Sequence, residues 1–76
     1  MAEPAILDAR GLRCPLPVLK ARKAMKVLPA GATLRVLATD PAAIKDFEAF
    51  CKTTGYLLLG ASQDGEILTF DIQKTE

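Results

Sequence analysis

The sequence predicts an α+β fold, a two-layer α/β sandwich in which a four-stranded mixed sheet carries two helices on one face. Two segments with helical spacing of apolar residues alternate with short segments of strand formers. An Asp64-Gly65 pair, typical of a tight hairpin, then separates two further strand-like segments. The predicted order is therefore β-α-β-α-β-β. A chain of 76 residues allows one domain over residues 1–76, with an ordered core at about residues 5–73.

The first half of the chain supplies a strand, a helix and a second strand. Residues 5–8 are expected to form a short strand. Residues 17–28 carry apolar side chains at helical spacing, at Val18, Ala21, Met25 and Leu28. Pro29 and Gly31 are expected to end this helix. Residues 33–39 are rich in strand formers and too short for a typical helix.

The second half supplies a helix and a hairpin. Asp40-Pro41 is a favourable helix start, because the carboxylate can accept from free amides and proline suits the first helical position. This helix is expected to run to about residue 54 and to end at Gly55, with an apolar face of Ile44, Phe47, Phe50 and Cys51. Residues 56–61 form an apolar run expected of a strand covered on at least one side. Residues 66–73 alternate, which places on one face Leu68, Phe70 and Ile72.

Composition excludes several classes of chemistry. The chain has no histidine, which removes histidine-based catalytic pairs and histidine metal ligands. Its two cysteines, Cys14 and Cys51, are too few for a structural zinc site. The start of the chain lacks the pattern of a signal peptide, and no apolar stretch approaches the length of a membrane span. We therefore expect a cytoplasmic protein with reduced thiols.

Charge is distributed unevenly, although the net charge is only +1. Residues 9–39 contain no acidic residue and seven basic ones, namely Arg10, Arg13, Lys20, Arg22, Lys23, Lys26 and Arg35. This basic segment either docks a partner with an acidic surface or forms only the solvated faces of two helices. Direct binding to nucleic acid is not favoured, because the few aromatic residues form no stacking array.

The local sequence Arg13-Cys14-Pro15-Leu16-Pro17 places a cysteine where the chain enters the first helix. Free amides of that turn, such as those of Leu16 and Val18, and the nearby Arg10 and Arg13 are expected to favour the thiolate of Cys14. We recognise no general base beside it. A nucleophile activated by position suits thiol exchange or sulfur transfer. The alternative is that Cys14 is a small buried hydrophobic residue.

Other candidate residues are assigned structural roles. Cys51 lies on the apolar face of the second helix and is expected to be an inert core thiol. Asp40 is expected to cap that helix rather than to act as an acid catalyst. Phe47, Phe50 and Phe70 fall at core positions and are counted as packing.

Residues 7–17 resemble the signature of the TusA (SirA-like) sulfur-carrier family, which combines Leu-Asp, Gly-Leu and Cys-Pro-x-Pro. Residues 39–41 and 50–55 are similar to the family's second helix and its end, and the resemblance extends from about residue 6 to residue 72. One departure is Tyr56, where many members have histidine. The resemblance implies a fold like the C-terminal domain of translation initiation factor 3.

The resemblance also implies a function. Cys14 would accept sulfane sulfur as a persulfide and pass it to a partner protein, without a metal or organic cofactor. The donor would be a cysteine desulfurase or a rhodanese-like protein. The acceptor would be a downstream relay protein, as in 2-thiolation of the wobble uridine of tRNA or in sulfur oxidation. Such a protein is a carrier within sulfurtransferase relays rather than an independent catalyst.

Several residues around Cys14 are expected to support that role. Arg10, Arg13 and Lys20 would hold the anionic sulfur or dock the partner, and Pro15 and Pro17 belong to the motif. We expect a monomer that does not contact a membrane. Two alternatives remain open: an RNA-binding or regulatory module that uses the basic first helix, and a thiol redox protein in which Cys14 is oxidised.

Overall fold

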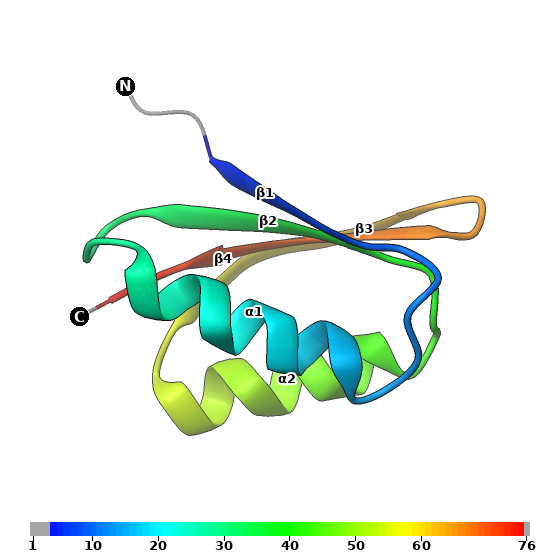
Figure 1. The fold of residues 1–76 in the computed structure, drawn as a ribbon, viewed down its shortest axis with the longest axis horizontal. Helices are drawn as coiled ribbons and strands as arrows, with labels where there is room; N and C mark the ends of the chain where they lie inside the picture. Colours follow the sequence, from blue (N-terminus) through cyan, green and yellow to red (C-terminus); the bar gives the residue numbers. More distant parts are fainter. Residues whose placement is uncertain (1–3, 76) are drawn as a thin grey trace.

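The computed structural model describes residues 4–75, which form four strands and two helices (Figure 1). The described range leaves out residues 1–3 and 76, which are the ends of the predicted domain. The expectation that the start of the chain is not a signal peptide therefore falls partly outside the described residues. The elements are β1 (Ala5–Ala9), α1 (Leu16–Val27), β2 (Thr33–Ala38), α2 (Ala43–Thr54), β3 (Leu57–Asp64) and β4 (Ile67–Gln73). This order confirms the predicted β-α-β-α-β-β succession.

The four strands of the described residues form one mixed sheet in the order β1-β2-β4-β3. β1 pairs with β2 in parallel, whereas β4 is antiparallel to both β2 and β3. Both helices lie on the same side of the sheet, as Figure 1 shows. The predicted two-layer sandwich is therefore confirmed, and no helix of residues 4–75 covers the other face of the sheet.

The helix boundaries differ from the predicted ones by one to three residues. α1 ends at Val27, because Leu28 adopts an extended conformation before Pro29, as residues that precede proline prefer. α2 begins at Ala43 instead of at Asp40-Pro41, since the two residues after Asp40 form a turn before the helix starts. Gly55 ends α2 as predicted, with φ 82° and its N–H bonded to the Cys51 carbonyl at 2.9 Å.

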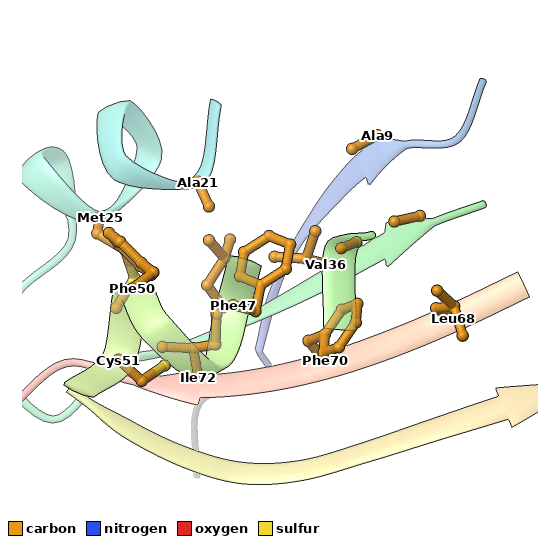
Figure 2. Close-up of a cluster of buried hydrophobic side chains, with 13 residues drawn as sticks. Ala9, Ala21, Met25, Val36, Phe47, Phe50, Cys51, Leu68, Phe70 and Ile72 are labelled. Atoms are coloured by element: carbon orange, nitrogen blue, oxygen red, sulfur yellow. The ribbon is translucent and has the colours of Figure 1, made fainter. Parts of the chain in front are cut away.

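The core lies between the helices and the sheet and is built around Phe47 of α2 (Figure 2). The Phe47 ring is fully buried and stacks on Phe70 of β4, with ring centroids 4.7 Å apart. Phe50 packs edge-on against Phe47 and against Tyr56. The predicted alternation in β4 is confirmed, since Leu68, Phe70 and Ile72 are all buried. The three phenylalanines are therefore packing residues, as expected.

The expectation of a covered third strand is largely wrong. Most of β3 is exposed, with Leu57 and Leu59 half open to solvent, and Leu58 is the β3 residue that packs partly against the core. The reason is position: β3 is an edge strand, and a register irregularity between Leu58 and Gly60 interrupts its alternation. Hydrophobicity alone did not reveal this, because the location of a strand in the sheet depends on its pairing.

Candidate functional site

Cys14 is exposed in the loop that joins β1 to α1, directly before the first turn of α1. This position confirms that the cysteine lies at the helix entry and excludes the alternative of a small buried residue. Cys51, by contrast, is 6% exposed within the core, as predicted, and both thiols are free. The two cysteines therefore have different environments: Cys14 is exposed to solvent, and Cys51 is a packing residue.

Asp40 fixes the backbone at Cys14. Its carboxylate accepts from the Cys14 N–H at 2.7 Å and from the Ala42 N–H at 3.0 Å. These amide contacts, followed by the charge of Arg13, lower the pKa of Asp40. The predicted helix cap is thus only half right. Asp40 closes the turn that precedes α2, and it also ties that turn to the cysteine loop, 26 residues away in the sequence.

Asp46 is the functional candidate that the sequence analysis missed. The Cys14 Sγ–H donates a hydrogen bond to Asp46 Oδ2, across 32 residues of sequence. Asp46 lies in the first turn of α2, next to the buried Phe47, so the fold of α2 holds its carboxylate toward the loop. Helical spacing could have pointed to Asp46. This residue shares with Ala49, Phe50 and Thr53 the face of α2 that borders α1. A carboxylate therefore does lie beside the thiol, where no general base was recognised.

The expected low pKa of Cys14 is wrong for this arrangement. The hydrogen bond to Asp46 raises the pKa of the thiol above its ordinary value, and partial desolvation and the charges of Asp46 and Asp40 act in the same direction. The Leu16 amide, expected to face the sulfur, donates instead to the Arg13 carbonyl at 2.8 Å. Cys14 is therefore held as a protonated thiol by groups from the second helix and the loop before it.

Arg10 does not contact the sulfur in this structure. Its guanidinium forms two hydrogen bonds with Asp8, from Nε at 2.8 Å and from the Nη2 nitrogen at 2.9 Å. The pair lowers the pKa of Asp8 to about 2 and raises the pKa of Arg10. Arg13 instead lines a hollow of about 320 Å³ together with Gly11, Leu12, Thr39 and Asp40. Of the two arginines expected near Cys14, the structure brings Arg13 close to the acidic surroundings of the cysteine.

The basic segment of residues 9–39 is not one surface. Arg35 lies on β2 and pairs with Asp71 of β4 at 2.8 Å, so its charge is balanced on the sheet. Arg10 is balanced by Asp8. The remaining basic side chains other than Arg13 lie exposed on α1, namely Lys20, Arg22, Lys23 and Lys26. The predicted basic face is therefore reduced to α1 and the loop before it.

A shallow groove of about 240 Å³ runs between α1 and α2. It is lined by Pro15, Val18, Arg22, Asp46, Ala49, Phe50 and Thr53. The guanidinium of Arg22 lies 5.7 Å from the centre of the Phe50 ring, a distance typical of a cation–π contact. Pro17 is buried in the first turn of α1, whereas Pro15 is exposed at the groove. Two residues of the groove adjoin Cys14: Asp46 contacts its thiol, and Pro15 follows it in the chain. The groove therefore lies beside Cys14.

No helix within residues 4–75 is long and apolar enough to cross a membrane. No group of three or more side chains of the types that bind metal ions is assembled in that range.

Comparisons with known proteins identify relatives over nearly the whole chain. A family model described as sulfurtransferase TusA matches residues 5–74. A Neisseria meningitidis protein, named as a candidate sulfur carrier, is 51% identical over 67 residues, covering 88% of this chain and 90% of that protein. The sulfur carrier protein TusA of Allochromatium vinosum is 46% identical over 69 residues, which are 91% of each chain.

A solved structure supports the same relationship. The crystal structure of a SirA-like protein from Desulfitobacterium hafniense superimposes with a TM-score of 0.81 at 26% sequence identity, covering 95% of this chain and 99% of the other. Both the sequence and the fold thus match the family suggested by the Cys-Pro-x-Pro motif. The chain belongs to the sulfurtransferase TusA family.

Proposed function

We propose that this chain is a sulfur carrier, in which Cys14 accepts sulfane sulfur as a persulfide and passes it to a partner protein. The observation that carries the proposal is the exposure of Cys14 at the entry of α1, beside a groove and a basic helix, in a chain of this family. The names of the relatives agree with a carrier role. Cys51 is a poor candidate for the same role, because burial shields it and raises its pKa.

The transfer needs only thiol chemistry. The Cys14 thiol first loses its proton, and the thiolate attacks the terminal sulfur of the donor's persulfide. The bond between that sulfur and the donor's own sulfur breaks, a bond to Cys14 Sγ forms, and the donor sulfur leaves as a thiolate. Attack by an acceptor thiolate on the terminal sulfur of Cys14 then repeats the exchange. Electrons balance at each step, so the proposal requires no metal or organic cofactor.

The proposed partners are proteins on both sides of this exchange. The donor is a cysteine desulfurase or a rhodanese-like protein, and the acceptor is a further relay protein. The relay serves either 2-thiolation of the wobble uridine of tRNA or sulfur oxidation, in the cytoplasm. We propose that the chain acts as a monomer, since one Cys14 site can hold the transferred atom.

Docking is proposed to use the exposed basic residues of the loop and α1. Arg13 and Lys20 lie on this surface. Arg10 is also proposed to belong to it, although its guanidinium forms an ion pair with Asp8. Pro15 contributes the edge of the groove, and Pro17 anchors the first turn of α1 in the core. A partner with an acidic surface around its own reactive cysteine would fit this arrangement.

Reversing charge on α1 is expected to slow sulfur loading. The double variant Lys20→Glu/Lys23→Glu should reduce the loading rate about tenfold at low salt, because steering between opposite charges is lost. The difference should shrink as salt is raised, since exposed charges are screened. The matched control is Lys45→Glu/Lys52→Glu, which reverses two exposed charges on α2. Equal slowing of both double variants, measured by intact-mass kinetics, would contradict docking through α1.

Sulfur loading of the unaltered chain tests the proposed function directly. Incubation with a cysteine desulfurase, pyridoxal phosphate and cysteine should add one sulfur atom, about 32 Da, as a persulfide. Intact-mass analysis gives the stoichiometry, and peptide mapping should place the added sulfur on Cys14. The absence of any addition, with this donor and with a rhodanese-like donor, would refute the carrier role.

A further inference from the structure

The thiol of Cys14 is held by a carboxylate that the carrier chemistry described above does not require. Its Sγ–H donates to Asp46 Oδ2, and its backbone N–H donates to Asp40. Resting on the proposed function, we propose that Asp46 is a positioning residue that distinguishes the empty carrier from the loaded one. It holds the unloaded thiol against α2, and it turns the sulfane sulfur of the loaded form away from α2.

In the empty carrier, the thiol is fixed from two sides. Asp40 restrains the backbone of Cys14, and Asp46 restrains its sulfur. Asp46 is itself held in place, since α2 is anchored by the fully buried Phe47 directly after it. A carboxylate that accepts a hydrogen bond from a thiol favours the protonated form. The empty carrier thus presents a neutral thiol of low nucleophilicity.

Loading removes the hydrogen atom on which this contact depends. In a persulfide, Sγ is bonded to Cβ and to the terminal sulfur, so it carries no hydrogen and cannot donate to Asp46. The terminal sulfur is the acidic group of the persulfide, and its anion is repelled by the carboxylates of Asp46 and Asp40. Arg13 is the cation next to Cys14 in the sequence, and its charge acts on Asp40. The sulfane sulfur therefore turns outward, where an acceptor can attack it.

After loading, the carboxylate of Asp46 is exposed in a groove that a partner can contact. Asp46 lines the groove between α1 and α2 together with Arg22 and Phe50. In the empty carrier Asp46 is engaged by Cys14, whereas in the loaded carrier it is free to interact with Arg22 or with a partner's donor group. The chemical state of Cys14 is thereby transmitted to the groove, which gives donor and acceptor a difference to recognise.

The first test measures the reactivity of the empty carrier, without any sulfur donor. The rate of alkylation of Cys14 by iodoacetamide is followed by peptide mass spectrometry from pH 6 to pH 10 in the unaltered chain and in Asp46→Asn. The charged groups that act on Cys14 are Asp46 of α2 and Asp40 before it, and Arg13 acts on Asp40, so this variant removes one of two negative charges. We expect a lower thiol pKa and alkylation about tenfold faster at pH 7, because more of the thiol is ionised.

Glu48→Gln is the matched control, because Glu48 is an exposed acid on the same helix and makes no hydrogen bond to Cys14 among the described contacts. Its alkylation profile should coincide with that of the unaltered chain. An unchanged or slower rate in Asp46→Asn would overturn the proposal, and slowing would indicate that Asp46 acts as a general base. An equal acceleration by Glu48→Gln would also overturn it, since helix charge alone would then explain the effect.

The second test uses the unaltered chain, so it does not depend on the folding of a variant. Methyl methanethiosulfonate converts Cys14 to a mixed disulfide, which replaces the Sγ hydrogen with sulfur just as loading does. The carboxyl ¹³C resonance of Asp46 should move on this reaction, and that of Glu48 should not. A stationary Asp46 resonance would refute the contact. Because neither test needs a sulfur donor, failure of the carrier function would show in the loading experiment instead.

Discussion

Replacing Phe47 with alanine is expected to lower the free energy of unfolding by about 3–5 kcal/mol, the cost typical of removing a buried aromatic ring. Phe47 is fully buried, stacks on Phe70 with ring centroids 4.7 Å apart, and meets Phe50 edge-on at 6.3 Å. It joins α2 to β4 in the middle of the core. Since small domains are stable by only about 5–15 kcal/mol, the loss would bring this one close to unfolding.

Urea unfolding followed by circular dichroism measures this effect. Val27→Ala is the control, because Val27 is 84% exposed at the end of α1 and its change should stay within about 0.5 kcal/mol. The midpoint of Phe47→Ala should lie far below that of Val27→Ala. Similar midpoints for the two variants would mean that Phe47 is not the centre of the core.

Replacing Cys14 with serine is expected to abolish sulfur loading completely. The serine hydroxyl can still donate a hydrogen bond to Asp46, so the local structure should be retained. It has no sulfur to form a persulfide bond, however, and the mass increase should disappear. The fold should remain intact, because the side chain of Cys14 is exposed.

Cys51→Ala is the matched control for that experiment. Cys51 is buried on α2 and is not expected to exchange with a donor, so this variant should load one sulfur atom as the unaltered chain does. Intact-mass analysis of both variants under the same conditions shows which cysteine carries the added sulfur. Loading of Cys14→Ser, or loss of loading in Cys51→Ala, would contradict the assignment of the persulfide to Cys14.

Much of the fold could be predicted because its signals are local. Apolar spacing located both helices, and alternation in β4 gave the buried set of Leu68, Phe70 and Ile72. The start of α2 was placed too early because Asp40-Pro41 is equally compatible with a turn. The exposure of β3 was missed because its sequence is apolar, whereas its position at the sheet edge follows from pairing with β4 alone.

The candidate site was predicted in part. The place of Cys14 at the helix entry followed from the prolines beside it, and the contrast with Cys51 followed from the apolar face of α2. The roles expected of the neighbouring cations did not follow. Arg10 lies near Cys14 in the sequence, yet it is bound to Asp8, and Arg35 is bound to Asp71. A charge pattern along a chain does not record which charges neutralise one another.

The sequence by itself therefore determined the order of elements, the family and the identity of the exposed cysteine, because these depend on short-range patterns and motifs. The tertiary structure alone decided the surroundings of that cysteine. Asp40 and Asp46 reach Cys14 from 26 and 32 residues away, when α2 packs beside α1. Electrostatic effects depend on distance in space, so the protonation of Cys14 is set by contacts that no local pattern contains.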